Sequence, residues 1–313
     1  MTSIIPSNRT IRIGTRSSPL ALAQAYETRT RLMEAHDLPE ERFQIVKKTS
    51  AGDRIQEQSL RDFGGKGLFT KEIEEALLAD EIDVAVHSMK DVATDLPPGL
   101  VIPCLLPRED VRDAFLSFTA KSLADLPQGA KVGTSSLRRQ SQIRHLRPDL
   151  KVVEFRGNVQ TRLHKLEEGV ADATFLANAG LRRLGYEDKI TALVEIDEML
   201  PAVSQGAIGL QIREDDEDMA ALIAPLNHQK TFDCVSMERV FLGRLDGNCR
   251  TPIAGLAVLA GNDISFRGMI LSPDGSEAHE TTRLGPVAEA EKLAIDAADE
   301  LLDKVGADFL ARS

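Results

Sequence analysis

Hydroxyl, glycine and cationic side chains recur together where apolar runs of the sequence end. Thr15-Arg16-Ser17-Ser18 and Ser88-Met89-Lys90-Asp91 come first, and Thr134-Ser135-Ser136-Leu137-Arg138-Arg139 and Phe155-Arg156-Gly157-Asn158 follow. A helix that starts at such a point offers N–H groups and the positive end of its dipole to an anion. Arginine adds a planar fork for carboxylate or phosphate. Serine before a helix is more often only a cap, but the recurrence favours a cleft for a ligand with several acidic groups.

Two further side chains could take part in a reaction. Asp91 follows Lys90 directly, and among many cations its carboxylate would stay ionised. It could stabilise a cation or pass a proton to an amine leaving group, although an ordinary turn aspartate is an equal alternative. Cys249 stands in the glycine-marked turn Gly247-Asn248-Cys249-Arg250, where the neighbouring cation favours the reactive thiolate. Taken alone, such a cysteine is more often an unreactive loop thiol.

Other candidate residues favour structural roles. Cys104 and Cys234 lie among apolar neighbours, which predicts that they pack in the interior. Three cysteines cannot build a disulfide framework, and their spacing matches no metal site. The run Gly64-Gly65-Lys66-Gly67 lacks the spacing of a nucleotide-binding loop, and we interpret Lys66 as a lid residue over the cleft. His87 has no partners at the spacing of a catalytic triad and is interpreted as structural.

Charge is distributed unevenly over the 313 residues. The whole chain carries a net charge of −11, which argues against general nucleic-acid binding. Residues 131–165 hold nine Lys or Arg and two acids, a net +7, so the remaining residues carry −18. This basic block indicates a focused anion site, and a solvated helix face is the alternative. The sequence contains neither the ~18 continuous apolar residues of a membrane helix nor a signal-peptide pattern, so we expect a cytoplasmic protein that does not bind membranes.

The predicted elements place these residues at the ends of strands. Alternating strands and helices indicate α/β units with parallel strands, and the ends of such strands are where open sheets bind ligands. A polar, glycine-rich loop spans 49–67, and residues 201–213 are expected to return to the first domain. A small α+β domain is expected from 231 onward. The expected strands are 10–15, 44–48, 82–86, 100–105, 113–118, 131–134, 151–155, 171–177, 253–260 and 263–271, and the expected helices are 18–36, about 69–77, 137–146, 159–168, 232–245 and 287–305.

Seven motifs in order, together with the cysteine loop, resemble the porphobilinogen deaminase (hydroxymethylbilane synthase) family of the haem pathway. The resemblance covers essentially the whole chain. The motifs are Ile13-Gly14-Thr15-Arg16-Ser17-Ser18-Pro19-Leu20-Ala21-Leu22, Gly65-Lys66-Gly67-Leu68-Phe69, Ala85-Val86-His87-Ser88-Met89-Lys90-Asp91, Arg112-Asp113-Ala114-Phe115, Val132-Gly133-Thr134-Ser135-Ser136-Leu137-Arg138-Arg139, Arg156-Gly157-Asn158-Val159 and Gln205-Gly206-Ala207.

The resemblance implies a fold and a reaction. Two α/β lobes similar to periplasmic binding proteins, with mixed, mainly parallel sheets, would precede a small C-terminal α+β domain. Their expected ranges are 1–105 with 201–225, then 106–200, then 228–313. A covalent dipyrromethane cofactor, joined to Cys249 by a thioether, would prime the head-to-tail condensation of four porphobilinogen molecules to hydroxymethylbilane with release of ammonia. A monomeric transferase without a metal is expected.

The same resemblance implies roles for individual residues. Asp91 and Lys90 would be catalytic, with Asp91 stabilising the cation that forms when ammonia leaves, and Lys66 would belong to the lid. The cofactor would be held by Cys249, Ser88, Lys90, Asp91, Thr134, Ser136, Arg138, Arg139, Arg156 and Gly157. The substrate would be held by Arg16, Ser18, Gln24, Arg156, Arg162, Arg183 and Gln205.

Four positions depart from the family pattern: Asp62, Ala93, Ser204 and Asn248. They bear on local loop geometry and not on the chemistry. The competing hypothesis is a non-catalytic anion-binding or sensor protein on the same two-lobed scaffold. That hypothesis accounts for the arginines and hydroxyls but leaves Asp91 and the Cys249 loop without a role. The mass of the purified chain separates the two hypotheses.

Overall fold

The computed structural model describes residues 9–49, 70–246, 251–305 and 309. Two compact units emerge from the contacts within the chain. The described residues of the first unit are 9–49, 70–109 and 207–232, and those of the second are 110–206, 233–246, 251–305 and 309. The division into three domains, with the boundaries expected above, stays a prediction. Lys66 and Cys249 lie outside the described residues.

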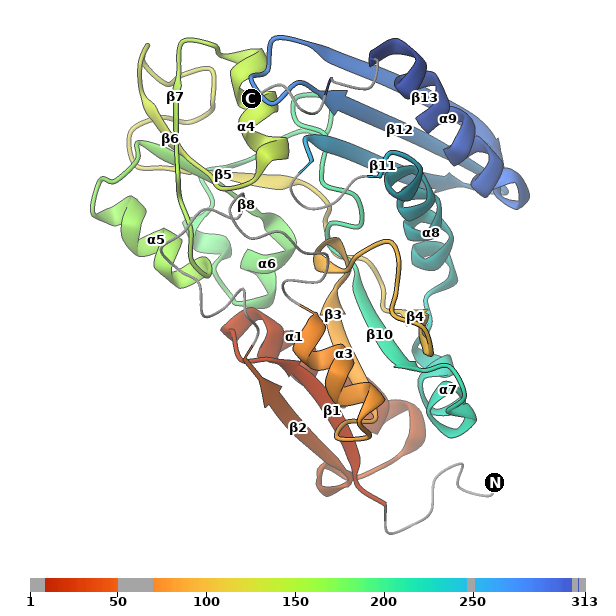
Figure 1. The fold of residues 1–313 in the computed structure, drawn as a ribbon. Helices are drawn as coiled ribbons and strands as arrows, with labels where there is room; N and C mark the ends of the chain where they lie inside the picture. The colour runs from red at the N-terminus through yellow and green to blue at the C-terminus, as the bar shows by residue number, and fades with distance from the viewer. Residues whose placement is uncertain (1–8, 50–69, 247–250, 306–308, 310–313) are drawn as a thin grey trace. The chain divides into compact units, whose positions relative to one another are not determined.

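A five-stranded sheet forms the centre of the first unit (Figure 1). The strands are β1 (Ile11–Arg16), β2 (Phe43–Lys48), β3 (Val84–Ser88), β4 (Leu100–Leu105) and β10 (Ile208–Arg213), in the order β2-β1-β3-β10-β4. β1 runs parallel to β2 and β3, whereas β10 is antiparallel to β3 and β4. β10 inserts between two strands that precede it by about a hundred residues, so residues 207–232 belong to the first unit.

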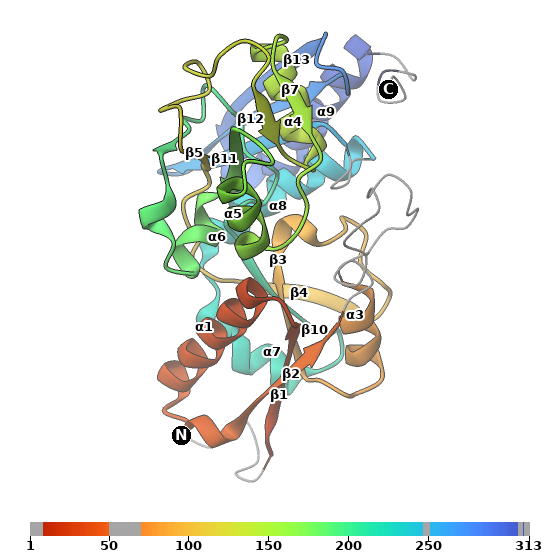
Figure 2. The same cartoon turned by 90° about the vertical axis from the view of Figure 1, so that its left-hand side faces the viewer.

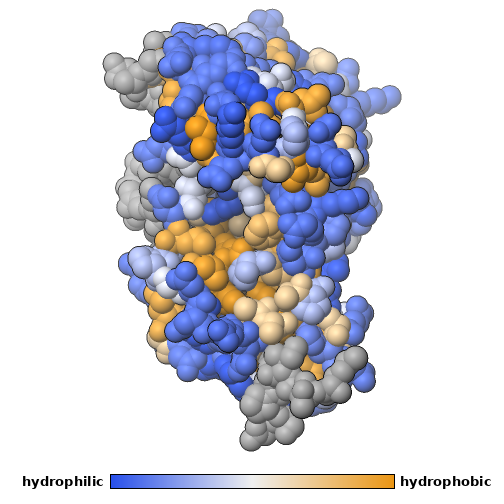
Figure 3. All heavy atoms as spheres, turned by 90° about the vertical axis from the view of Figure 1, so that its right-hand side faces the viewer, coloured by the Kyte–Doolittle hydropathy of each residue, from blue (hydrophilic) through white to orange (hydrophobic). Residues whose placement is uncertain are grey.

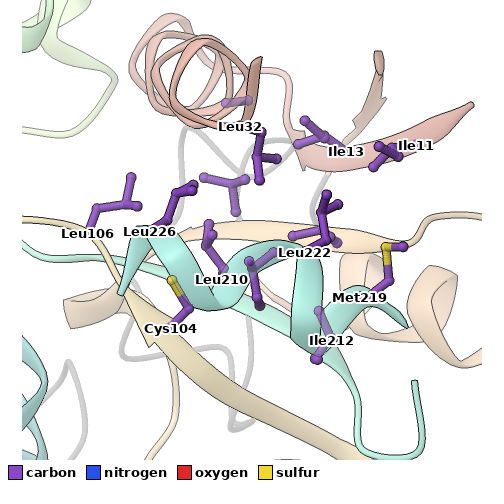
Figure 4. Close-up of a cluster of buried hydrophobic side chains, with 14 of the residues drawn as sticks. Ile11, Ile13, Leu32, Cys104, Leu106, Leu210, Ile212, Met219, Leu222 and Leu226 are labelled. Atoms are coloured by element: carbon purple, nitrogen blue, oxygen red, sulfur yellow. The ribbon is translucent and has the colours of Figure 1, made fainter. Parts of the chain in front are cut away.

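Helices cover both faces of this sheet. They are α1 (Pro19–His36), α3 (Lys71–Leu78) and α7 (Glu217–Ile223), with single turns η1 (Glu40–Arg42), η3 (Met89–Asp91) and η5 (Ala224–Leu226). Alternate strand residues such as Ile13, Leu210 and Ile212 pack with Leu32 of α1 and Leu222 of α7 (Figure 4). The opposite face packs against α3, and α1 and α3 lie on opposite sides of the strands in Figure 2. The period of two along a strand produces this two-sided core.

The second unit begins with another five-stranded sheet. Its strands are β5 (Asp113–Ser117), β6 (Lys131–Gly133), β7 (Lys151–Val153), β8 (Ala173–Ala177) and β9 (Ala192–Leu193), in the order β7-β6-β8-β5-β9. Its helices are α4 (Leu137–Leu146), α5 (Val159–Glu167) and α6 (Asn178–Arg183), with η4 (Glu187–Lys189). Ile143 of α4 packs in one cluster with Phe115 and Phe175, while Leu166 of α5 and Leu181 of α6 pack in another. The sheet therefore has a core on each face.

A three-stranded antiparallel sheet completes the second unit. It contains β11 (Ile253–Ala260), β12 (Asp263–Leu271) and β13 (Ala278–Pro286), and it packs with α8 (Gln229–Arg244) and α9 (Ala290–Val305), which η6 (Val287–Glu289) precedes. A separate apolar cluster joins Leu200 and Val111 to Leu256 and Met269 of this sheet. The small sheet is thus tied directly to the segment before β5 and to the segment after β9.

Most expected elements are confirmed, and the differences concern short or polar segments. α4, β11 and β12 have the predicted ranges, whereas β9, α6, α7 and β13 were not predicted. Mixed sheets are confirmed, but the expected excess of parallel pairs is wrong for the described strands, since each five-stranded sheet has two parallel and two antiparallel pairings. Hydrophilic residues cover most of the face in Figure 3, with smaller groups of hydrophobic residues between them. None of the described helices is long and apolar enough to cross a membrane.

Candidate active site

In the first unit, β1 ends at Arg16 and α1 begins three residues later. Ser18 caps α1, with its Oγ accepting a hydrogen bond from the Ala21 N–H at 3.3 Å. Thr15 Oγ1 donates to the Ala21 carbonyl at 3.0 Å, which ties the strand end to the first helical turn. The cap interpretation of Ser18 is therefore confirmed. The turn fixes Arg16 at the C-terminal end of β1, where its side chain is partly exposed.

Asp91 lies beside Arg16 in the same unit. The Asp91 Oδ2 atom is 3.6 Å from Arg16 Nη1, and both side chains are partly exposed, at 30% and 21%. Asp91 and Lys90 belong to the single turn η3, which follows β3 without interruption. The structure therefore brings together two residues that are 75 positions apart in the sequence. A carboxylate that stays accessible beside a cation can stabilise further positive charge close to it.

Ser88 and Gln24 form a reciprocal contact. Gln24 Nε2 donates to Ser88 Oγ at 2.9 Å, and Ser88 Oγ lies 3.1 Å from Gln24 Oε1. Gln24 is 3% exposed on α1, whereas Ser88 is partly exposed at the end of β3. The expected ligand contact of Gln24 is untested. Its position in the structure is behind Ser88, which it holds in place.

His87 is buried on the sheet face that packs against α3. Its Nε2 lies 2.8 Å from Gln211 Oε1 on β10, and Gln211 Nε2 donates to Glu74 Oε1 at 3.2 Å. Glu74 in turn accepts a hydrogen bond from Thr70 Oγ1 at 3.1 Å. Burial lowers the pKa of His87 to about 4, against the opposing effects of the Gln211 hydrogen bond and the Asp91 charge. The ring is therefore neutral near neutral pH, as a structural histidine should be.

In the second unit, polar groups gather at the start of α4. Ser136 caps the helix through a 3.5 Å hydrogen bond from the Arg139 N–H, and the Ser136 N–H donates to Thr134 Oγ1 at 3.2 Å. Ser135 Oγ is buried and has no hydrogen-bond partner among the described residues. This strand-to-helix turn presents hydroxyls and helix N–H groups together, which is an arrangement suited to an anion.

Arg138 and Arg139 both turn inward and meet Asp113 of β5. The carboxylate accepts from Arg138 Nη2 at 2.6 Å and from Arg139 Nη2 at 2.8 Å, and Asp113 is fully buried. Both arginines also donate to backbone carbonyls, Arg138 to Leu200 at 2.8 Å and Arg139 to Phe175 at 2.9 Å. Burial alone would raise the pKa of Asp113, but the two guanidinium groups outweigh it and hold the pKa far below its usual value. Asp113 is therefore ionised.

Gln205, which was expected at the substrate, also forms hydrogen bonds inside the protein. Gln205 Nε2 donates to Asp113 Oδ1 at 2.9 Å and to the Val111 carbonyl at 2.7 Å. The preceding Ser204 has a positive φ of 63°, and its N–H donates to Glu238 Oε2 at 2.6 Å. Glu238 of α8 is fully buried and accepts a second hydrogen bond from the Ala257 N–H at 2.9 Å. This buried carboxylate fixes the loop from which Gln205 extends.

The remaining predicted cations lie at the starts and ends of helices in the second unit. Asn158 caps α5, and Arg162 in its first turn donates from Nε to the Gly157 carbonyl at 2.8 Å. Gly157 has a φ of 121°, and an added Cβ would lie 2.6 Å from the Thr161 side chain, so only glycine fits there. Arg156 is largely shielded, at 11% exposure. Arg183 at the end of α6 donates to the Gly206 carbonyl at 3.1 Å, next to Gln205.

Two family models match the chain. One, described as porphobilinogen deaminase, dipyromethane cofactor binding domain, matches residues 11–221, and the other, the porphobilinogen deaminase C-terminal domain, matches 232–303. Porphobilinogen deaminase of Paracoccus denitrificans is 57% identical over 309 residues, which cover 99% of each chain. The chain belongs to the porphobilinogen deaminase family. The protein of that name from Nitrobacter winogradskyi is also 57% identical, over 95% of this chain and 94% of its own.

A solved structure outside the porphobilinogen deaminase family is more distantly similar. It is a nutrient binding protein from Burkholderia cenocepacia bound to methionine, with 15% identity and a TM-score of 0.42. The similarity covers 68% of this chain and 88% of that one. At this level it settles nothing about the fold, and the family assignment rests on the sequence matches.

The described residues of the second unit fit the cofactor of the porphobilinogen deaminase family. A dipyrromethane carries carboxylates, and the groups at the start of α4 are donors: hydroxyls, helix N–H groups and two guanidinium ions. Arg138 Nε is buried without a hydrogen-bond partner in the described part of the chain, and a buried donor of this kind requires an acceptor. Within the described ranges, no group of three or more His, Cys, Asp or Glu side chains is arranged to hold a metal ion.

Two residues of the candidate site were not predicted to have roles. Asp113 stands within the Arg112-Asp113-Ala114-Phe115 motif, so the sequence marked its position without indicating its partners. Glu238 lies in the middle of a helix and follows Val235 and Met237, where an acid would ordinarily face solvent. Its burial depends on two backbone N–H groups distant in the sequence, which no local pattern reveals. The packing interpretation of Cys104 and Cys234 is confirmed, since both lie in apolar clusters.

Proposed function

We propose that the chain is a porphobilinogen deaminase, a transferase of tetrapyrrole biosynthesis. It condenses four porphobilinogen molecules head to tail to hydroxymethylbilane and releases ammonia at each addition. The observation that carries this proposal is the 57% identity over 99% of the chain to a curated porphobilinogen deaminase. The accessible Asp91 carboxylate beside Arg16 supports it independently.

In the first unit, Asp91 and Arg16 act on the substrate. When the aminomethyl C–N bond of the substrate breaks, the bonding electrons leave with nitrogen and positive charge develops on the carbon and pyrrole. The ionised carboxylate of Asp91 stabilises this charge, an electrostatic effect that typically contributes several kcal/mol to barrier lowering. Arg16 binds a substrate carboxylate and keeps the substrate close to Asp91. Lys90 in the same turn and Ser88 behind it supply further donors to the ligand.

The second unit holds the cofactor through carboxylate-binding groups. Thr134, Ser136, Arg138, Arg139 and Gly157 bind the dipyrromethane, and Cys249 forms its thioether. When bound, this group supplies the pyrrole carbon to which the substrate units are added. Arg156 and Arg162 meet the acidic side groups of the incoming unit, and Arg183 supports them from the end of α6. Gln24 and Gln205 are mainly supporting residues, because each is committed to a protein hydrogen bond.

The cellular and assembly properties belong to the same proposal. We infer a monomer in the cytoplasm without a nucleic-acid partner, and the net charge of −11 supports the last of these statements. Lys66 acts as the lid residue. Sedimentation of the purified chain and fractionation of its cells test these statements, and a stable dimer or a membrane-bound fraction would contradict them.

Mass measurement of the purified chain tests the central claim. The chain should be heavier than its sequence by two porphobilinogen molecules less two ammonia, and it should convert porphobilinogen to hydroxymethylbilane. Cys249→Ser should abolish both the added mass and turnover. Cys104→Ala and Cys234→Ala are matched controls that should retain both, since those thiols are buried in apolar clusters. An unmodified thiol in active protein would refute the proposal, and an unmodified, inactive chain that binds polycarboxylates would support the sensor hypothesis instead.

A further inference from the structure

Asp113 connects Arg138 and Arg139, which the proposed function places at the cofactor, with the supporting residue Gln205. Its carboxylate oxygens accept hydrogen bonds from Arg138, Arg139 and Gln205 at 2.6 to 2.9 Å. A longer bond of 3.3 Å joins Arg139 Nε to Oδ2. Asp113 itself is fully buried and negatively charged, so it does not bind the carboxylates of an acidic ligand directly. Any effect it has on the ligand must pass through its partners.

The geometry fixes both guanidinium planes. Each arginine is held at two points, by Asp113 on one side and by a backbone carbonyl on the other, Leu200 for Arg138 and Phe175 for Arg139. Arginine has five N–H donors, so each side chain keeps donors that these contacts do not use. Arg138 Nε is among them, buried and without a partner in the described chain. The orientation of the unused donors is therefore set by the contacts to Asp113.

The charges of the cluster leave it cationic. Two arginines and one aspartate give a net charge of +1, and both Arg138 and Arg139 are at most 5% exposed. Without Asp113, two guanidinium ions would stand unshielded against each other in the interior. Burial and the neighbouring Arg139 both lower the pKa of Arg138, while Asp113 opposes them. One counter-charge thus allows the pair to be buried, and one positive charge remains for an anionic ligand.

We propose that Asp113 is a positioning residue for the cofactor: it orients Arg138 and Arg139 so that their unused donors meet the carboxylates of the dipyrromethane. This inference rests on the proposed function. Gln205, held by the loop that Glu238 fixes, supports Asp113 from the other side. The alternative is that Asp113 only stabilises the fold, as a buried carboxylate among arginines would in any protein.

Asp83 offers a matched control for that alternative. It is also fully buried in an arginine cluster, with Arg9 Nη2 at 2.9 Å and Arg12 Nη2 at 2.8 Å. It directly precedes β3, at the end opposite Ser88, and contacts none of the residues assigned to the ligand in the described structure. Asp83→Asn therefore removes a comparable carboxylate from a place without a ligand role.

The experiment compares Asp113→Asn, Asp113→Glu and Asp83→Asn with the unaltered chain. Two quantities are measured on the folded, monodisperse fraction of each: the share of chain carrying the cofactor mass, and kcat and KM separately. At metal sites, loss of a residue that orients a ligating side chain typically costs about 10- to 100-fold. By the same reasoning, Asp113→Asn should reduce the loaded share by about tenfold or more. Asp83→Asn should lower the melting temperature and leave the loaded share of folded chain within about twofold of the unaltered protein.

Asp113→Glu keeps the experiment decisive if Asp113→Asn does not fold. It retains the charge and lengthens the side chain by one methylene, so the fold should survive while the guanidinium planes shift. Misplacement by about 1 Å can cost about 100-fold in rate, and we expect a loaded chain with a raised KM and a reduced kcat/KM. An Asp113→Glu chain with unchanged loading, KM and kcat overturns the inference, as does equal loading of Asp113→Asn and Asp83→Asn. If the unaltered chain carries no cofactor and is inactive, the proposed function fails, and the inference fails with it.

Discussion

Acidification should destabilise the first unit through His87. The folded ring is buried, and its Nε2 contacts an amide oxygen of Gln211 that can only accept a hydrogen bond. Nε2 is therefore the protonated nitrogen of a neutral ring. Burial lowers the pKa of the folded His87 to about 4, whereas an unfolded histidine has a pKa of about 6.5. The Asp91 charge favours the protonated ring and the Arg16 charge disfavours it, and both are included in that value.

The sign and size of the effect follow from these two pKa values. As the pH falls, the unfolded chain takes up the proton first, so the free energy of unfolding decreases. The contribution of His87 is fully present above about pH 6.5 and is lost progressively down to about pH 4. The two pKa values differ by about 2.5, and each pH unit corresponds to about 1.4 kcal/mol. The total loss is therefore about 3 kcal/mol, a large part of the stability of a typical domain.

A difference measurement isolates this contribution from the many acids that also titrate. The free energy of unfolding in urea is measured for the unaltered chain and for His87→Gln, whose amide can donate the same hydrogen bond but does not titrate. Between about pH 7.5 and about pH 4.5, the unaltered chain should lose about 2.5 kcal/mol more than the variant. Hydrogen exchange of the backbone amides of β3 and β10 should report the same change locally.

His164 provides the control for this measurement. It lies exposed on α5, where only Glu167 and Glu168 are within ion-pair distance among the described residues. His164→Gln should therefore change the free energy of unfolding by less than about 0.5 kcal/mol. A pH-independent difference between the unaltered chain and His87→Gln, constant within about 0.5 kcal/mol, would show that His87 is not buried as a neutral ring.

Three further changes have defined outcomes. Asp91→Ala should abolish turnover while the cofactor mass stays attached, because the residue acts on the developing cation; near-normal turnover would contradict this role. Ser204→Gly should raise the free energy of unfolding by about 1 kcal/mol, since φ is 63° there and a left-handed non-glycine residue costs about 1–2 kcal/mol. Unchanged or lower stability in urea would contradict that strain. Gly133→Ala should destabilise by about 2 kcal/mol or more, because its Cβ would lie 2.5 Å from the Phe155 ring, and an unaltered melting temperature would show that the ring can move aside.

Strongly periodic segments of the fold could be predicted from the sequence. α4 and the hairpin of β11 and β12 have the expected bounds because apolar spacing, a serine cap and a Gly261-Asn262 turn mark them clearly. β13 was not predicted, since residues 278–286 are mostly polar and pair with only one neighbouring strand. The antiparallel positions of β5 and β10 also depend on long-range pairing. No local pattern indicates which strand a segment will join.

The candidate site could be predicted by residue type but not by arrangement. Arg138 and Arg139 were correctly marked as a pair, yet the sequence does not show that both turn inward to a carboxylate about 25 residues earlier. Gln24 and Gln205 were expected at the ligand, and each makes a hydrogen bond within the protein. Within the basic block of residues 131–165, some cations are likewise paired inside the protein. Arg147, for example, forms an ion pair with Asp149 at 2.7 Å. Burial and pairing decide which cations remain available, and these depend on tertiary packing.

The two aspartates of the candidate site differ in burial, and burial decides whether each contacts the ligand or holds other side chains in place. Asp91 lies 3.6 Å from one arginine and keeps 30% of its side chain exposed, so its charge can act on a ligand. Asp113 lies 2.6 Å from Arg138 and is fully buried, so its charge is used by the protein. Both are Asp residues near arginines within family motifs, and sequence reasoning cannot rank them. Asp91 can contact a ligand directly, whereas Asp113 acts by fixing Arg138 and Arg139. The chemistry of Asp91 and the positioning role of Asp113 are therefore separable, one through turnover and the other through cofactor loading.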